Sequence, residues 1–450
     1  MRALVLNPPS PATRGRRRSG TRPGGLEVRD IQAPEPHAPG WVVVRPALAG
    51  ICSSDLSLIQ HGSVPTTLAA RVVSRPLIPG HEVVGVVERA AATRWAREGH
   101  RVLVEPTLTC VHKGLPECPR CKAGDTHLCE NSDRGGALCS GPAIGSSERA
   151  GGGWSEGLLV HEDMLVPADG ISDQRGVLAE PAATALHAVL RWAQRGDRAV
   201  VIGLGTLSSL IVATLHRLVP GVDVTVLHDI DVPRPERRIA RLRPGMERRA
   251  RVPAQPPAGA SRLWSGSPAE LIERTATHVG ARVIRAAGES LPVLDRGVDV
   301  VFDCTGSGAS LDLAVRLLRG GGTLVLSGPS GRHVMEWPLI WARELTVCGA
   351  AHYGREPDGR RTFAVIREWL TDASFPVDAL VTHRFPLDEF GPALETAVAG
   401  QTAGAVKVVF EGPEASFQRR PPAEDAGAGE DAPVLLQSTA ARVREAHRAS

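Results

Sequence analysis

Residues 199–218 read AVVIGLGTLSSLIVATLHRL, and this stretch decides the fold. It begins with an apolar strand, passes through a glycine-rich turn at 203–208, and continues as an apolar helix. A strand with no polar alternation is buried on both faces, as in a parallel sheet covered by helices. A glycine-rich turn between such a strand and a helix is typical of dinucleotide binding, because the backbone and the helix N-terminus can approach a pyrophosphate.

The same alternation of strand and helix continues on both sides of this stretch. Apolar strands are expected at 222–227, 298–303 and 323–328, and helices after Pro181, from a capping box at Ser267, and over 310–320. This order predicts a doubly wound α/β domain with a parallel sheet. Residues 26–110 instead contain short Val-rich segments bounded by Pro or Gly, which predict a β-rich domain. The segment that continues to about 411 is mixed and ends in a strand.

Composition places the chain among globular proteins. It has 450 residues, of which 42% are hydrophobic and 22% charged, and a net charge of +3, too small to indicate nucleic-acid binding. The N-terminal apolar run is too short for a signal peptide, and the apolar stretch 199–215 is interrupted by glycines and serines. We therefore expect a cytoplasmic protein with no nucleic-acid or membrane partner, in which cysteines stay reduced.

Individual residues of the glycine-rich turn have separate roles in the predicted cofactor site. Gly203 permits the tight turn, Gly205 allows close approach of the pyrophosphate, and Ser208 replaces the usual third glycine. Asp229, just past the next strand, would bond the ribose and favours NAD. Ser327 and Gly328, at the end of the strand 323–328, are also expected to contact the cofactor.

An alternative cofactor preference comes from the basic run that follows. Arg234, Arg237 and Arg238 could bind a 2′-phosphate and favour NADP, although such runs are more often solvated. Asp229 favours NAD over this alternative.

Two groups of residues could hold metal. Residues 110–129, CVHKGLPECPRCKAGDTHLC, contain four cysteines, which in a reducing compartment favour metal over disulfides. The second group is spread over the motifs GICSSD, PGHEVVG and AEP, and a Cys, a His and a carboxylate from these motifs can supply three ligands of a catalytic zinc. Its candidate ligands are Cys52, His81, Glu82 and Glu180, and Ser54 and Asp55 lie in the same motifs as candidate catalytic residues.

Taken together, the motifs resemble those of the zinc-dependent medium-chain alcohol dehydrogenases, nearest the sorbitol and threonine dehydrogenase branch. The matching segments are GICSSD, PGHEVVG, RVLVEP, CPRCKAGDTHLC, LAEPAATALHAV, GLGTLS and DCTGSG, in the family's order over residues 26–411 except for an inserted stretch after 232. The resemblance implies a GroES-like catalytic domain interrupted by a Rossmann domain. The implied parts are a catalytic domain at 1–181 with a structural-zinc lobe at about 105–135, a Rossmann domain at 182–350, and a return to the catalytic domain at 351–411. The tail at 412–450 is expected to be disordered because it is rich in Pro, Ala, Glu and Gly.

The resemblance also assigns roles at the catalytic zinc. Cys52 and His81 match ligands of the metal, and Glu82 matches a carboxylate that binds the metal or lies behind it. Glu180 matches the carboxylate of this branch, Ser54 the hydroxyl that takes the substrate proton, and Asp55 the partner of His81. The family's relay histidine is replaced by Ser57, which leaves His61 as a possible substitute.

At the structural zinc the spacing departs from the family's pattern. That pattern would put the first cysteine at Leu115, so Cys110 is displaced and His112 is a rival ligand. The longer loop costs roughly 0.9 kcal/mol of closure entropy, against about 10–16 kcal/mol for a structural zinc. We therefore predict four thiolate ligands, Cys110, Cys118, Cys121 and Cys129.

The expected function is a zinc-dependent oxidoreductase that transfers hydride between a secondary alcohol or polyol and NAD, with NADP possible, using two zinc ions per chain. Two alternatives remain open, an NADPH-dependent carbonyl reductase and a non-catalytic member of the family. A zinc ribbon of a nucleic-acid-binding protein would not need Cys52, His81 and Glu180. The resemblance further implies a homodimer or homotetramer that pairs through residues 346–350.

Overall fold

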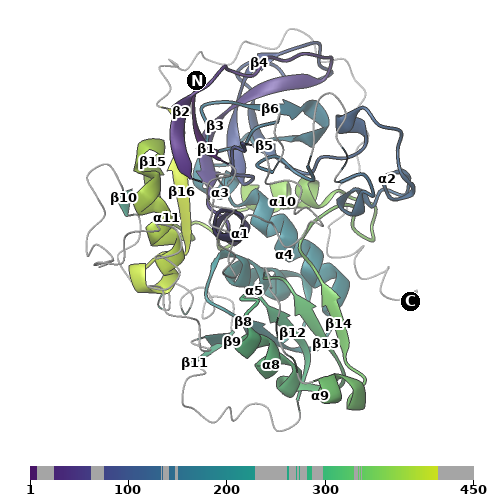
Figure 1. Cartoon of the computed structure of the whole chain (residues 1–450). Helices are drawn as coiled ribbons and strands as arrows, with labels where there is room; N and C mark the ends of the chain where they lie inside the picture. Colours follow the sequence, from purple (N-terminus) through teal and green to yellow (C-terminus); the bar gives the residue numbers. More distant parts are fainter. Residues whose placement is uncertain are drawn as a thin grey trace, which may run out of the picture.

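The computed structural model contains two large sheets with helices between and around them (Figure 1). It describes residues 1–7, 25–61, 76–132, 134, 141–146, 150–228, 261–262, 270, 273, 281–285, 297–328, 333, 335 and 337–413. Residues 8–24, most of the inserted stretch after 232, the capping box at Ser267 and nearly all of the tail 412–450 lie outside these ranges.

The second half of the chain forms a six-stranded sheet in which every pairing is parallel. Its strand order is β11-β9-β8-β12-β13-β14. The bounds are β8 Arg198–Ile202, β9 Asp223–His228, β11 Arg282–Arg285, β12 Val298–Asp303, β13 Leu318–Leu326 and β14 Thr346–Gly349. The order reverses at β8, which confirms the predicted doubly wound fold and puts the ligand crevice at the carboxyl end of this strand.

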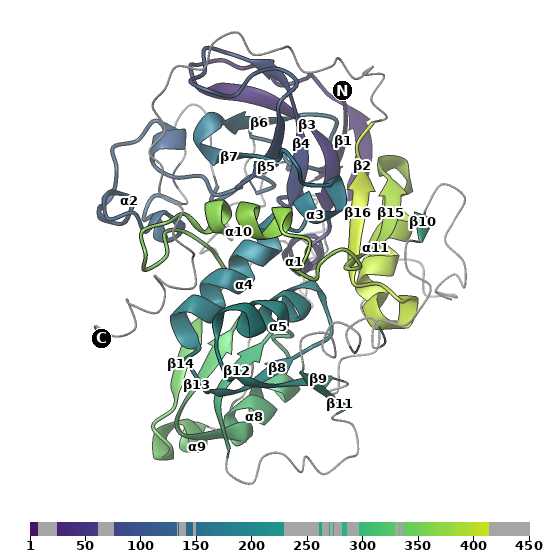
Figure 2. The ribbon, with the colours of Figure 1, turned by 180° about the vertical axis from the view of Figure 1, so that it is seen from behind.

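Both faces of this sheet are covered, as the apolar character of β8 predicts. Val201 belongs to the core shared with α4 (Ala179–Trp192) and α5 (Thr206–Leu218), whereas Val200 and Ile202 pack on the opposite face with α8 (Gly308–Leu317). Figures 1 and 2 show α4 and α5 above the sheet and α8 with α9 (Trp337–Ala342) below it.

The first half of the chain forms a mostly antiparallel sheet with β3 (Trp41–Gly50) at its centre. β3 pairs with β4 (Val83–Ala90), β6 (Leu158–His161) and β16 (Lys407–Glu411). The sheet also contains β5 (Arg101–Val104), β7 (Leu165–Pro167), β10 (Ser261–Arg262) and β15 (Val381–Pro386), while β1 (Arg2–Leu6) and β2 (Leu26–Asp30) form a separate pair. Because β15 and β16 join β3, the chain returns to its first sheet after completing the parallel one.

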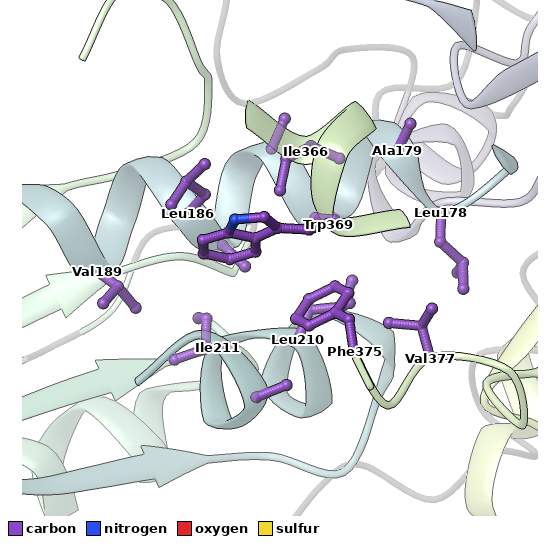
Figure 3. Packing of buried hydrophobic residues seen from close by; sticks show 14 of the residues in the cluster. Leu178, Ala179, Leu186, Val189, Leu210, Ile211, Ile366, Trp369, Phe375 and Val377 are labelled. Carbon is purple, nitrogen blue, oxygen red and sulfur yellow. The ribbon is translucent and has the colours of Figure 1, made fainter. Parts of the chain in front are cut away.

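A single apolar core connects the two sheets. Figure 3 shows Leu186 and Val189 of α4, Leu210 and Ile211 of α5, and Trp369 of α10 (Thr362–Thr371) packed together. Side chains of the first sheet, among them Leu48, Val84 and Leu103, belong to the same cluster. The N-terminal end of α4 is therefore fixed at the junction of the two halves.

Helix α4 begins at Ala179, two residues before the predicted start at Pro181. A proline within the first turn lacks only an N–H that would have no partner in the helix. The earlier start puts Glu180 in the first helical turn, where the helix dipole favours a carboxylate.

The lobe around 105–132 has little regular structure. It contains η3 (Val111–Lys113), α2 (Pro119–Lys122) and η4 (Thr126–Leu128), and its buried cluster is formed by the four cysteines with Leu115 packed against them. A segment with so little apolar surface needs another source of stability, such as a metal. No helix of the described residues is long and apolar enough to cross a bilayer.

Candidate functional site

The predicted catalytic ligands converge from two turns of the first sheet. Cys52 precedes α1 (Ser53–His61), and His81 and Glu82 directly precede β4. One ligand atom from each of the three residues lies within 4.8 Å of the other two. Cys52 and His81, with a carboxylate from Glu82 or from Glu180, are a donor set that suits zinc with an open position, so these residues fit the metal that the resemblance implies.

Asp55 orients His81. Its buried carboxylate lies 3.2 Å from His81 Nδ1 through Oδ1 and accepts the backbone N–H of Cys52 at 3.0 Å through Oδ2. With Nδ1–H directed to Asp55, Nε2 is left with its lone pair for a metal. Burial lowers the pKa of His81, but the charges and hydrogen bonds of Asp55 and Cys52 outweigh it and leave the pKa raised.

Ser54 lies next to this set, with Oγ 3.5 Å from His81 Nε2. A hydroxyl at this position is close enough to share a substrate proton. Ser57 lies in the same helix, and the side chain of His61 lies outside the described part of the chain, so the relay beyond Ser54 stays a prediction.

Glu82 has a partner that the sequence analysis missed. Lys407 Nζ donates to both carboxylate oxygens of Glu82, at 2.7 and 2.6 Å, and both side chains are buried. Burial lowers the pKa of Lys407, but the negative charges of Glu82, Cys52 and Glu180 have the larger effect. The net result is a raised pKa, so the ammonium stays charged. Its signal in the sequence was a single cation inside the apolar strand AVKVVF.

Glu180 lies beside this set but is not part of the compact group of three. Burial raises the pKa of its carboxyl group to about 7, while His81, Lys407 and a hydrogen bond from Tyr353 act in the opposite direction. Tyr353 is buried, is the only tyrosine in the chain, and also has a hydrogen bond with Thr107. It was not singled out from the sequence because a lone tyrosine carries no spacing pattern.

The glycine-rich turn has the geometry that dinucleotide binding needs. Gly203 has φ +122°, and a Cβ there would lie 3.1 Å from Thr305 Cγ2. A Cβ on Gly205 would meet nothing within 4 Å in the described structure, so the turn leaves room for a ligand at this point. Ser208 Oγ bonds the N–H and the carbonyl of Gly205, which closes the first turn of α5.

Ser327 and Gly328 lie at the carboxyl end of β13, two strands from the turn in the same sheet. Their backbone N–H groups donate to the carbonyl of Asp303, and a Cβ on Gly328 would lie 2.6 Å from the backbone of Cys304. Ser327 Oγ is buried and has no hydrogen-bond partner among the described residues. An unpaired buried hydroxyl at this edge fits a cofactor that would supply the partner. Asp229 lies outside the described residues.

The structure gathers the four predicted thiols of the lobe, with their sulfur atoms within 4.8 Å of one another. Cys110 Sγ lies 3.6 Å from Cys129 Sγ, too far for a disulfide and close to the edge of about 3.8 Å expected for a zinc tetrahedron. Cys110 Sγ also accepts hydrogen bonds from the Cys118 N–H at 3.4 Å and from Asn131 Nδ2 at 3.3 Å. A hydrogen bond from the Cys121 backbone lowers the pKa of Cys118 to about 6. The donor set therefore fits a structural zinc.

His112, the rival ligand, is not part of the thiol group. Its Nδ1 accepts the Thr109 N–H at 3.0 Å, and its ring lies 5.4 Å from that of His161. Burial lowers the pKa of His112 to about 3.

Comparison with known proteins places these features in context. Residues 38–170 match the model of the alcohol dehydrogenase GroES-like domain, and residues 272–370 match that of zinc-binding dehydrogenases. The chain is 27% identical to sorbitol dehydrogenase of Macaca fascicularis over 391 residues, covering 84% of this chain and 91% of the relative. It is 25% identical to L-threonine 3-dehydrogenase of Deinococcus deserti over 390 residues, with coverages of 85% and 95%. The crystal structure of 2R,3R-butanediol dehydrogenase from Bacillus subtilis has the same fold, with a TM-score of 0.64, 22% identity, and coverage of 92% of this chain and 99% of that one.

Proposed function

The chain belongs to the zinc-dependent medium-chain alcohol dehydrogenases, and from that premise we propose that it oxidises a secondary alcohol or polyol with NAD, or reduces the matching ketone. The observation that carries the proposal is the close pair of Cys52 and His81, with Ser54 at one ring nitrogen of His81 and Asp55 at the other. A sheet of the dinucleotide-binding type, with its glycine-rich turn, accompanies this group.

When bound at these residues, zinc would supply a Lewis acid for the substrate oxygen and NAD would supply the hydride acceptor, which are functions that side chains lack. The residues of the chain provide position and proton transfer. Asp55 fixes the tautomer of His81, and Ser54 Oγ receives the hydroxyl proton of the substrate. The proton then leaves along α1, where Ser57 and His61 are the candidates for the next step.

Among the carboxylates, Glu180 and Glu82 have different surroundings. Both oxygens of Glu82 are engaged by Lys407, so in this arrangement Glu82 acts as a buried counter-ion behind Cys52 and His81. Glu180 is oriented by Tyr353, and a carboxyl group with a pKa of about 7 can exchange a proton near neutral pH. We therefore assign Glu180 as the carboxylate next to the reacting oxygen.

In the lobe, the four thiols Cys110, Cys118, Cys121 and Cys129 would hold the second zinc. That zinc would replace the hydrophobic core that the lobe does not have.

The cofactor is proposed to be NAD, on the strength of Asp229, with NADP as the alternative carried by the basic run after it. A carbonyl reductase using NADPH would share every other feature of the site. A non-catalytic role is disfavoured because the ligands, the proton acceptor and the orienting carboxylate are all present.

The assembly is proposed to be a homodimer, or a homotetramer built from it. β14 is the edge of the parallel sheet, Val347 on it is 39% exposed, and Trp337 and Trp341 of nearby α9 are 66% and 83% exposed. An exposed edge strand beside two tryptophans suits pairing with a second copy. The cytosol is the proposed location, since thiol ligands require reducing conditions.

Hydride transfer to NAD and to NADP from a panel of polyols and amino alcohols tests this proposal. The expected result is turnover of at least one secondary alcohol, with a higher kcat/KM for NAD than for NADP. Preference for NADP would shift the assignment to the basic run, and no turnover with any substrate in either direction would contradict the enzymatic function.

A further inference from the structure

His112, which the lobe does not use for its thiol group, belongs to a different cluster. Ligand atoms of His112, His161 and Asp163 lie within 4.8 Å of one another. The ligand atoms of the two groups expected to hold zinc, which are Cys52 with His81 and Glu82 and the four thiols of the lobe, are also within 4.8 Å of one another. Donors around one metal at about 2.1 Å are about 3.4 Å apart, so only a small closure would be needed.

We propose that His112, His161 and Asp163 form a third metal site, which binds a divalent cation of the zinc, cobalt or nickel type. Two imidazoles and one carboxylate are the donors that such borderline cations prefer, whereas magnesium and calcium require mainly oxygen ligands. The site is distinct from the two zinc sites of the family and shares no ligand with them.

The side chains of the cluster are already held in place. The His161 ring makes an edge contact with Trp41 at 5.5 Å and lies over Gly40, where a Cβ would come within 2.3 Å of Nε2. His161 Nδ1 lies 3.4 Å from Asp163 Oδ2. The other oxygen of Asp163 is paired with Arg94. A site whose ligands are positioned in advance loses less conformational entropy on binding.

Access to the cluster increases from His112 to Asp163. The His112 residue is buried, whereas the side chains of His161 and Asp163 are 15% and 45% exposed. A cation can therefore enter from the Asp163 side, and water can complete its coordination there, as in sites with three protein ligands.

Two features make this site weaker than the thiol group. Arg94 pairs with the Asp163 carboxylate, and Arg361 donates to the Asp163 carbonyl. The positive charges of these two guanidinium groups would repel a bound metal ion. Nδ1 of each imidazole already accepts a backbone N–H, from Thr109 in His112 at 3.0 Å and from Asp163 in His161 at 3.3 Å, so metal binding requires both rings to exchange or give up these hydrogen bonds. The third cation is therefore expected on exposure to free metal rather than in every purified molecule.

The location indicates what the metal would do. His112 is in η3 of the lobe, while His161 ends β6 and Asp163 is in η5 (Glu162–Met164) of the sheet. A bound cation would connect η3 of the lobe to the end of β6 in the sheet, and it would stabilise the folded state by an amount that rises with the logarithm of the free metal concentration above Kd.

Equilibrium dialysis of the full-length protein against micromolar zinc, followed by elemental analysis, tests the proposal. The wild type and the control His100→Ala, which changes an exposed histidine elsewhere, should each retain one zinc per chain more than His161→Ala and Asp163→Asn. The comparison between variants does not depend on activity or on how fully the other two sites are loaded.

Equal zinc content in all four proteins would overturn the proposal. Loss of the additional zinc in His161→Ala with retention in Asp163→Asn would overturn the assignment of Asp163 as a ligand. Melting temperature supplies the second readout, because added zinc should raise it more for the wild type and His100→Ala than for the two ligand variants.

Discussion

Replacing Lys407 with methionine should strongly destabilise the protein. The change removes an ammonium that bonds both oxygens of Glu82 at 2.7 and 2.6 Å and also donates to the Ile51 carbonyl at 3.3 Å. Glu82 would then be a buried carboxylate without its counter-ion. Removing one partner of a buried pair costs about 3–5 kcal/mol, which is a large share of the 5–15 kcal/mol that stabilises a typical protein.

The assay is urea-induced unfolding followed by circular dichroism, with the zinc concentration held constant. The matched control is Arg316→Met, which removes an exposed ion pair with Asp312 four residues earlier in the same helix and should cost less than about 1 kcal/mol. The double variant Lys407→Met with Glu82→Gln removes both charges and should recover part of the loss, which the double-mutant cycle measures. If Lys407→Met unfolds within about 1 kcal/mol of the wild type, like the control, the pair does not have the role that its geometry indicates.

Three further predictions concern the lobe, the proton path and the assembly. Cys110→Ala should lose one zinc per chain by elemental analysis and should have a lower melting temperature. His112→Ala should keep that zinc when the free metal concentration is low. The reverse result would make the site Cys3His. Ser54→Ala should lower kcat about a hundredfold with little change in melting temperature, and an unchanged rate would mean that the proton leaves by another route. Val347→Asp should reduce the mass measured by light scattering to that of a monomer, because a charge on an edge strand opposes pairing; an unchanged assembly would place the interface elsewhere.

The fold followed from the sequence where local patterns were strong. The unalternated strand at 199–203 and the glycines after it predicted a buried parallel strand and its turn, and the structure contains both. The start of α4 was less predictable, because Pro181 is tolerated anywhere in a first helical turn and therefore does not fix its first residue. The return of β15 and β16 to the first sheet was available only from the family resemblance, since no local signal in 381–411 indicates a partner.

The candidate site was predicted from residue types that form motifs, and it was missed where a residue acts alone. Cys52, His81 and Glu82 come from short motifs in which cysteine, histidine and glutamate are themselves informative. Lys407 and Tyr353 have no such signal, because their importance comes from residues that are distant in the sequence. Lys407 and Glu82, for example, are 325 residues apart. Only the folded chain brings such residues together.

Cys52 and His81 are proposed to hold the metal of a hydride-transferring enzyme. The most direct measurement compares wild type and Cys52→Ala for NAD reduction by a secondary alcohol that the wild type turns over, together with zinc content and melting temperature. We predict that the variant loses turnover and one zinc per chain, while it stays folded and keeps the zinc of the lobe. Turnover by Cys52→Ala at a rate close to that of the wild type would show that Cys52 does not hold a metal needed for hydride transfer.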